Sequence, residues 1–414
     1  MNIKKILIIL LCLKIILTFI FKYFSYQGNE SMELREDLLF YFTEEDIKNG
    51  TEYSRRGFLG SIASLIIQFA FIGVLVFSPI SSKIEDYFQT KTSGKFYPTA
   101  LLFLTTFYVT EFFISLPFTY YFGYILEHKF GFSNMTNSDW IILQLKSFIV
   151  GIALVTLVGL LAIFVLKKFQ KLWKIILPIG FIFIGLLFSI LMPIIITPIF
   201  YEYSEIQEGS LKNKILELTK KAKIPTSKIY VINESKYSGH TNAYFVGWGE
   251  NRKIFLYDTL INKNTEEEVI SILGHEIGHW IHNHQVKGIL FESVSLLILC
   301  FIISIIFNKA KEEGNLLLKE IYSPSSLPFI FLLISIFNML TTPLENYISR
   351  SDETEADRES LILTNDKKSF ISSEIKIARH NKSMLNPHPI AVKMYYTHPP
   401  TIERIKMAED YNKK

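Results

Sequence analysis

Long apolar blocks constrain the fold of this chain more than any other feature of its sequence. Seven stretches are long enough to cross a bilayer, which requires about 20 apolar residues. These stretches cover residues 5–25, 58–82, 98–123, 143–167, 173–200, 287–308 and 326–347. Such blocks, in a chain that is 49% hydrophobic, exceed what the surface of a soluble protein tolerates. The sequence therefore predicts an all-α, multi-pass membrane protein with about seven transmembrane helices.

Three of these stretches need a closer interpretation. The first follows Lys4 and Lys5 as a signal peptide would, but no Ala-x-Ala-like cleavage site follows, so we expect a retained helix rather than a cleaved signal. The third contains Glu111. A buried acid at membrane depth usually faces a bundle interior or a water-filled space; alternatively, this stretch lies deep in protein and contacts little lipid. In the fifth, Pro193 and Pro198 are expected to kink or end the helix.

Two polar segments divide the chain. Residues 1–200 would form a membrane domain with helices 1–5, and residues 287–348 would carry helices 6 and 7. The polar parts are 201–286 and 349–414. The first of them predicts a small mixed α/β region with a helix and a sheet. The expected helix covers 211–222, the expected strands cover 228–232 and 253–257, and 238–245 lies between the strands.

Charge and cysteine content exclude several classes of protein. The chain has 43 basic and 39 acidic side chains, a balance that does not suggest a nucleic-acid partner. Cys12 and Cys300 both lie in apolar runs, so neither a disulfide framework nor a cysteine metal site is expected. We expect a monomer whose surroundings are the lipid bilayer.

One motif in the first polar segment carries chemistry. Thr265-Glu-Glu-Glu268 is typical of a capping box, and it predicts a helix from about Glu266 toward the sixth span. That helix contains His275-Glu-Ile-Gly-His279. The spacing of four places both imidazoles on one face, where they can bind one zinc ion. Glu276 then lies beside the metal, where its carboxylate can take the proton of an attacking water.

A catalytic zinc ion needs a third protein ligand and one open position. His282 and His284 follow on the same predicted helix, but a straight helix cannot wrap three ligands around one ion, so we expect ordinary polar positions there. Glu353, just beyond the seventh span, is the better candidate. Asp357, four residues on, could hydrogen-bond the outer nitrogen of a zinc-bound histidine. Alone, this acidic cluster would be typical of a solvated helix face; the unmet ligand requirement favours Glu353.

These residues also resemble a known family, the type I CAAX prenyl endopeptidases, which are integral-membrane zinc metalloproteases with seven spans. The resemblance covers nearly the whole chain. Its strongest parts are His275-Glu-Ile-Gly-His-Trp280, Asn346-x-x-Ser-Arg-x-x-Glu-x-x-Ala-Asp357 and Tyr396-Thr-His-Pro-Pro-Thr-Ile-Glu-Arg404. Further similarity lies in Glu127-His-Lys-Phe-Gly-Phe132, Asn242-Ala-Tyr-Phe245, Phe255-Leu-Tyr-Asp-Thr-Leu260 and Leu385-Asn-Pro387. Two parts depart from the family: Ile281-His-Asn-His284 is more polar than expected, and 26–56 matches nothing.

The resemblance implies a role for each matching residue. His275, His279 and Glu353 would hold one zinc ion, Glu276 would be the general base, and Asp357 would orient a ligand. His398 would stabilise the oxyanion, Arg404 would support the site, and Asn242 with Ala243 would form a strand edge that pairs with the substrate backbone. The family further implies a water-filled chamber enclosed by the helices. The membrane would be the endoplasmic reticulum in a eukaryote or the inner membrane in a bacterium.

Three functions compete at this point. The first is an endopeptidase acting on a peptide or lipidated protein substrate, near the carboxyl end of prenylated CAAX-type proteins. The second is a quality-control metalloprotease without prenyl specificity, and the third is a multi-pass transporter or receptor with an accidental motif. Orientation is contested as well. Basic residues on the side opposite the catalytic segments predict that side to be cytoplasmic, whereas the resemblance implies cytoplasmic catalytic segments. Those residues are Lys4, Lys5, Lys167, Lys168, Lys171 and Lys174.

Overall fold

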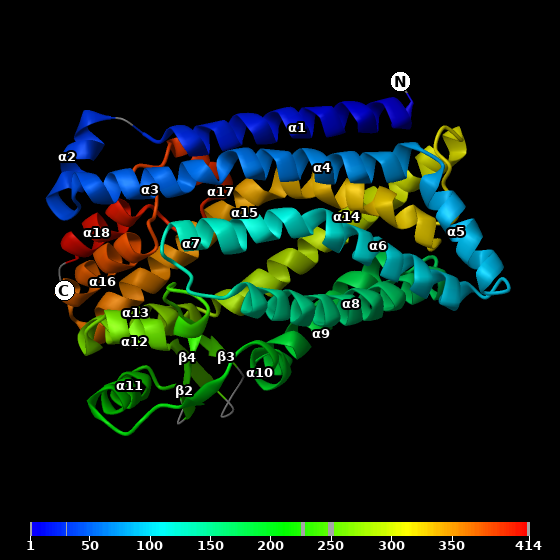
Figure 1. The fold of residues 1–414 in the computed structure, drawn as a ribbon. Coiled ribbons are helices and arrows are strands. Elements are labelled where there is room, and N and C mark those ends of the chain that lie inside the picture. The colour runs from blue at the N-terminus through cyan, green and yellow to red at the C-terminus, as the bar shows by residue number, and fades with distance from the viewer. Residues whose placement is uncertain (1, 30, 225–227, 247–251, 412–414) are drawn as a thin grey trace.

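Long helices running in roughly one direction dominate this computed structural model (Figure 1). The structure describes residues 2–29, 31–224, 228–246 and 252–411. One end of the helix array carries α5 (Ile80–Lys91), and the opposite end carries α2 (Met32–Tyr41) and the C-terminal helices (Figure 1). The first and last helices thus place the two termini at opposite ends of the molecule.

The predicted membrane helices are confirmed. Six helical segments in the described chain are long and apolar enough to cross a membrane, and a bent pair raises this to as many as seven. An α-helix suits such segments because it satisfies every backbone N–H and C=O within itself, as a lipid environment demands. The long helices are α1 (Ile3–Gln27), α4 (Phe58–Phe77), α6 (Phe96–Tyr120), α8 (Asn137–Lys168), α9 (Trp173–Leu191), α14 (His284–Glu313) and α15 (Leu327–Thr364).

The expected interruption of the fifth span is present as a bend of 51° between Trp173–Ser189 and Ile194–Phe200. The helical path changes there from α9 to a π-helical turn η2 (Met192–Ile196) and then to α10 (Thr197–Phe200), which contains Pro198. The side chain of Pro193 lies outside the described part of the chain. A second π-helical turn, η1 (Tyr121–Leu126), follows Pro117 at the end of α6 and leads into α7 (Glu127–Lys129).

Glu111, the acid inside the third span, is half-buried and accepts a hydrogen bond from Ser115, 2.8 Å away on the same helix. Only 11% of the apolar window of this span is buried in protein, the same share as in α8. This favours the interpretation in which Glu111 faces the inside of the bundle or a water-filled space, over one in which protein encloses the whole span.

Residues 26–56, in which the sequence analysis found no similarity to the family, lie against the C-terminal helices. This segment folds into α2 and α3 (Glu44–Arg56), which pack against α16 (Lys367–His380), α18 (Thr401–Glu409) and the loop before α17 (Pro389–Tyr395). Leu38 and Phe42 share an apolar core with Leu385 and Ile402. The amino-terminal part of the chain therefore holds in place the segment that carries Arg404.

A four-stranded sheet and three short helices lie beside the helix array, as expected for 201–286. The strand order is β1 (Tyr203–Glu205), β2 (Lys228–Ile232), β4 (Lys253–Tyr257) and β3 (Ala243–Val246), and only the β2–β4 pair is parallel. The two predicted strands are confirmed with the same bounds. Helices α11 (Ser210–Lys221) and α12 (Asp258–Lys263) and the 3₁₀ turn η3 (Glu234–Lys236) complete the region. Buried Ile229, Ile254 and Leu256 pack on α13 (Glu266–Ile281).

The predicted capping box opens α13. Thr265 accepts from the Glu268 N–H, and the Glu268 side chain accepts from the Thr265 N–H. The sixth and seventh spans, α14 and α15, are joined through the 3₁₀ turn η4 (Pro324–Ser326). The last turns of α15 run along α13, and this contact builds the site.

Candidate active site and metal centre

Two glycines let α15 lie almost against the backbone of α13. A Cβ on Gly278 would come within 2.7 Å of Ala356 Cα, and a Cβ on Gly274 would come within 2.9 Å of Ser360 Oγ. Ser360 donates from that hydroxyl to the carbonyl oxygen of Ser271, 2.7 Å away. Because both glycines flank the histidine motif, the closest approach of the helices falls where the predicted metal ligands lie.

The close packing brings three predicted ligands together. His275 Nε2 lies 3.1 Å from Glu353 Oε2, and His279 Nε2 lies 3.3 Å from Glu353 Oε1. The two Nε2 atoms are 3.1 Å apart. One atom from each residue lies within 4.8 Å of the others, an arrangement that can hold a metal ion. The structure therefore places His275, His279 and Glu353 as one group, from two helices far apart in the sequence.

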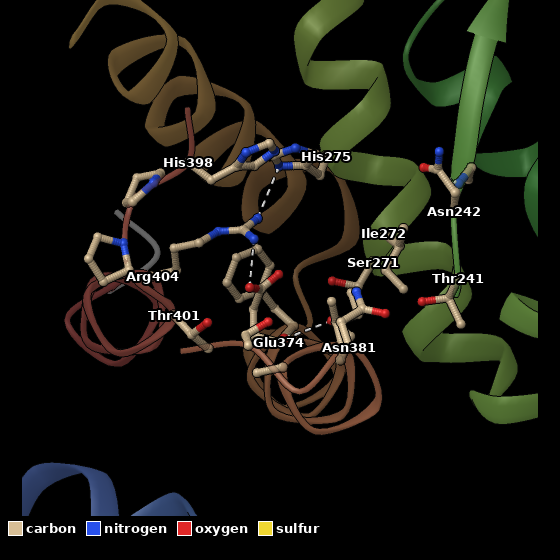
Figure 2. Close-up of a pocket in the computed structure, with 18 of the residues that line it drawn as sticks. Thr241, Asn242, Ser271, Ile272, His275, Glu374, Asn381, His398, Thr401 and Arg404 are labelled. Atoms are coloured by element: carbon tan, nitrogen blue, oxygen red, sulfur yellow. Dashed lines mark hydrogen bonds and ion pairs between the residues drawn. The ribbon is translucent and has the colours of Figure 1, made fainter. Parts of the chain in front are cut away.

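Asp357 and Arg404 support the ring of His275 on its Nδ1 side, opposite Glu353. Asp357 Oδ1 accepts from His275 Nδ1 at 2.7 Å, and Asp357 Oδ2 accepts from Arg404 Nε at 2.8 Å. Arg404 Nη1 pairs with Glu374 Oε2 at 2.6 Å. Figure 2 shows the guanidinium between His275 and Glu374. Burial raises the pKa of Glu374 to about 7; Arg404 opposes this shift, and the nearby charge of Asp357 adds to it.

A cation would stabilise the group formed by His275, His279 and Glu353, because their lone pairs face one another. Since Asp357 is a carboxylate, His275 must donate from Nδ1, and a neutral ring then turns a lone pair on Nε2 toward Glu353. Glu353 Oε2 is buried and has no hydrogen-bond partner. His nitrogen and carboxylate oxygen are the usual protein ligands of zinc, so this group of two imidazoles and one carboxylate suits that ion.

Glu276 lies where two cavities meet. It lines one of about 480 Å³, together with Asn242, Ala243, His398 and Arg404, and another of about 220 Å³ beside His279. Burial raises the pKa of its carboxyl above the ordinary range, although His275 and His279 oppose this. A carboxylate of raised pKa beside a metal is a suitable proton acceptor.

His398 reaches the group from the loop that precedes α18. Its Nε2 lies 3.3 Å from Glu353 Oε2, and its Nδ1 lies 2.9 Å from the hydroxyl of Thr397. The side chain keeps 58% of its area open to the cavity. Partial desolvation in this concave position lowers the pKa of His398, which favours a neutral ring with one N–H available for donation.

Asn242 and Ala243 border the same cavity at the start of β3, the last strand in the order of the described sheet. The Asn242 carbonyl oxygen accepts from the Tyr257 N–H of β4 at 3.0 Å. Successive residues of a strand direct their backbone groups to opposite sides. The Ala243 N–H therefore points away from β4, and it donates to the Asn242 side chain, Oδ1, at 2.9 Å.

The sequence predicted that His282 and His284 continue the helix of the metal motif, and this was wrong. His282 caps the end of α13, and His284 begins α14. Asn283 adopts a left-handed conformation (φ 55°), which ends α13 and starts α14 at His284. Asn tolerates that conformation better than most residues. The reversal brings His284 Nδ1 within 2.8 Å of His279 Nδ1. Both histidines lie at helix ends, as expected, outside the group of His275, His279 and Glu353, and both also contact carboxylates of α15.

Two further groups near the site received no role from the sequence, although Glu127 belongs to a run that resembles the family. Glu374 belongs to a helix whose apolar and polar spacing marks only an amphipathic face. His240 Nε2 bonds Glu127 Oε2 at 3.0 Å, and Glu127 also accepts from Tyr53. This ties the loop before β3 to α7 and α3.

Fold and site together place the chain among metallopeptidases that hold their metal helix against a bundle of membrane-length helices. The family follows from direct comparison. The chain belongs to peptidase family M48, whose model matches residues 205–412, and the model of the CAAX prenyl protease N-terminal region, with five membrane helices, matches residues 32–202. It is thus a zinc metalloprotease and an integral multi-pass membrane protein, and the transporter with an accidental motif is excluded.

Several relatives cover most of the chain. It is 33% identical to CAAX prenyl protease 1 of Saccharomyces cerevisiae over 72% of this chain and 69% of that protein. It is 27% identical to the uncharacterized metalloprotease YhfN of Bacillus subtilis over 94% of this chain and 93% of that protein. The crystal structure of S. mikatae Ste24p matches with a TM-score of 0.86 at 26% identity, over 99% of each chain.

Proposed function

We propose that this chain is an endopeptidase with one zinc ion, and that it cleaves short, flexible, membrane-tethered tails near the carboxyl end of prenylated CAAX-type proteins. The observation that carries the proposal is the Glu276 carboxylate, which lies beside the three-ligand group and lines the cavities on both of its sides. An extended peptide that runs from one cavity to the other must pass this carboxylate.

Each polar group has a distinct task in the proposed reaction. His275, His279 and Glu353 would hold the zinc ion, which would supply the positive charge needed to acidify the attacking water and polarise the scissile carbonyl. Glu276 takes the proton from that water and afterwards delivers it to the leaving amine. His398 donates its N–H to the oxyanion as the tetrahedral carbon forms.

The remaining residues hold these groups and the substrate. Asp357 fixes the ring of His275 through Nδ1, and Arg404 keeps Asp357 ionised and in place. Substrate backbone would pair with the outer edge of β3 at Asn242 and Ala243. Because the Asn242 side chain already holds the Ala243 N–H, substrate pairing requires that this short bond be exchanged for one to the peptide.

Selectivity would then come from access rather than from sequence, because backbone pairing carries little sequence information. The three residues that would hold zinc lie on α13 and on the C-terminal part of α15, whose other end forms a membrane-length helix. In this proposal residues 1–200 and 287–348 form the membrane part, and 201–286 and 349–414 form the catalytic part. A prenyl group would hold the tail near the site.

Cleavage of one peptide sequence in three forms tests the proposal: farnesylated, unmodified, and farnesylated but fused close to the scissile bond to a tightly folded domain. We expect the first to be cut fastest and the third to be spared. The Glu276→Gln protein and a chelator provide the inactive backgrounds. Equal cleavage of the compact fusion would overturn the model of restricted access.

A second function has support from one observation. One relative that matches 94% of this chain is a bacterial metalloprotease described as uncharacterized, so similarity to it implies no prenylated substrate. A quality-control protease that removes damaged membrane proteins would use the same site without prenyl selectivity. Equal rates on the farnesylated and unmodified peptides would favour this function over the first.

A further inference from the structure

A second cluster of histidines and carboxylates lies directly behind the metal ligand His279. It consists of His284, Asp352 and Glu355, which could by their positions hold a metal ion of their own. His284 is buried, with 7% of its surface exposed, whereas the side chain of Glu355 keeps 44% of its surface exposed. The cluster joins the beginning of α14 to α15, and none of its members has a task in the function proposed above.

A continuous chain of hydrogen bonds through His279 and His284 connects this cluster to the metal centre. His279 directs Nε2 toward Glu353 and His275, and its Nδ1 lies 2.8 Å from His284 Nδ1. On the far side, His284 Nε2 lies 2.9 Å from Glu355 Oε2 and 3.5 Å from Asp352 Oδ1. The two imidazole planes are inclined at 75°, so the rings meet through their nitrogen atoms rather than by stacking.

A metal ion at His279 determines where every proton in this chain of hydrogen bonds lies. If Nε2 of His279 gives its lone pair to zinc, Nδ1 must carry the ring proton and donate it. The facing atom, His284 Nδ1, must then accept with its lone pair. His284 Nε2 consequently carries a proton, and it donates that proton to the Glu355 carboxylate.

The same reasoning argues against a second metal ion at the cluster. Metal bound to His284 Nε2 would leave the ring proton on Nδ1, where it would face the proton on His279 Nδ1 at only 2.8 Å. Both sites can be filled together only if the bond between the rings breaks. The geometry therefore favours one metal ion, with the cluster serving it.

We propose that His284 is a positioning residue for the zinc ligand His279, and that Glu355 completes the support. His284 fixes the ring orientation and the tautomer of His279, as Asp357 does for His275. The carboxylate at the far end strengthens the donation of His279 to the metal. The left-handed Asn283 makes the arrangement possible, because it turns the chain back so that His284 meets His279. This proposal rests on the proposed ligand role of His279.

Zinc affinity, measured by competition with a chelator of known affinity, tests the proposal in the full-length purified protein. In His284→Leu the acceptor is lost, and affinity should fall by about 10–100-fold. In His284→Asn the amide oxygen can stand near the position of Nδ1, so most of the affinity should return. The absorption spectrum of the cobalt(II) form should change in the Leu variant and recover in the Asn variant.

A matched pair of variants examines the outer carboxylate. Glu355→Gln removes the charge that His284 meets, and it should lower zinc affinity less than His284→Leu does. Glu359→Gln makes the same change one turn further along α15, where Glu359 meets His282 and not His284. The zinc affinity of Glu359→Gln should equal that of the wild type. Thermal unfolding of the metal-free proteins separates a general loss of stability from the metal effect.

The outcomes discriminate clearly. Unchanged zinc affinity in His284→Leu, or an equal loss in Leu and Asn, would overturn the positioning role and leave the proposed function intact. Two zinc ions per wild-type chain, with one lost in His284→Leu, would assign the cluster as a second metal site instead. A His279→Ala variant that keeps its zinc would overturn the ligand role of His279 itself.

Discussion

At the scale of single residues, Glu276 shares its helix with His275 and His279, the two histidines of the proposed metal site, and it lines the cavities on both sides of that site. No described side chain donates a hydrogen bond to the Glu276 carboxylate, and burial raises the pKa of this carboxyl. These properties are those of a group whose partner is the reacting water rather than the protein.

Glu276→Gln should therefore abolish most of the activity without loss of zinc. The amide fills nearly the same space but cannot take a proton, and removal of a general base costs about 100–10,000-fold in rate. Turnover of a peptide substrate and elemental analysis of the purified variant measure the two quantities. Glu267→Gln, on the exposed first turn of the same helix, is the matched control. Near wild-type turnover in Glu276→Gln would assign the base elsewhere.

At the scale of elements, the contact between α13 and α15 decides whether the ligands meet. His275 and Asp357 are 82 positions apart in the chain, and only the flat packing of the two helices joins them. Helix axes approach this closely when small residues occupy the contact, because larger side chains separate the backbones. Gly274 and Gly278 fill that need on the same face as the histidines.

Gly278→Ala should consequently damage both stability and the metal centre. The added Cβ would lie 2.7 Å from Ala356 Cα and 2.8 Å from its carbonyl oxygen, and backbone atoms cannot move aside without shifting α15. Overpacking of this kind costs about 1–3 kcal/mol of the free energy of unfolding. Zinc affinity should fall with it, since Glu353 moves with α15.

Gly288→Ala serves as the control for this change. A Cβ on Gly288, within α14, would meet no atom within 4 Å among the described residues. Alanine also suits a helix better than glycine. We expect unchanged zinc affinity and equal or higher thermal stability. An equal loss in both variants would show that the close approach of α13 and α15 is not what glycine provides.

At the scale of the whole molecule, the catalytic segments share one end of the helix array, while α5 occupies the other end (Figure 1). The α5 end carries many lysines, and the positive-inside rule would make it cytoplasmic. Several of these lysines have partners there: Lys167 lies 3.5 Å from the centre of the Phe96 ring, and Lys319 pairs with Glu85 and Asp86. The rule is weak beside long polar segments, and the substrates proposed here expose their tails to the cytoplasm.

The C-terminus should therefore be cytoplasmic. A tag placed there should be protected from protease in sealed vesicles whose cytoplasmic face is inside, and it should become accessible when they are permeabilised or inverted. A tag between α4 and α6 should behave in the opposite way. The reverse pattern would follow the lysine distribution, and it would remove cytoplasmic prenylated tails from the set of substrates.

The sequence by itself determined the features that depend on neighbouring residues. Membrane helices follow from the length of their apolar runs, and α13 follows from its capping box and its helical spacing. His275 and His279 lie on one face of α13 because they are about one helical turn apart. The strands β2 and β4 are likewise local, because both five-residue runs are rich in β-branched and aromatic residues. Glu353 and Asp357 were placed near the metal by the spacing of their helix together with the family resemblance.

Only the tertiary structure decided the contacts between distant segments. It ended α13 at Asn283 and turned His284 onto His279, against the prediction of one continuous helix. It put Glu374 against Arg404, and it occupied the Ala243 N–H with the Asn242 side chain. The physical reason is that an amphipathic pattern states which face of an element is buried, but not which polar group on another element that face will meet. Close packing makes that choice, since it leaves buried charges stable only where a partner of opposite charge or a hydrogen-bond donor lies within reach.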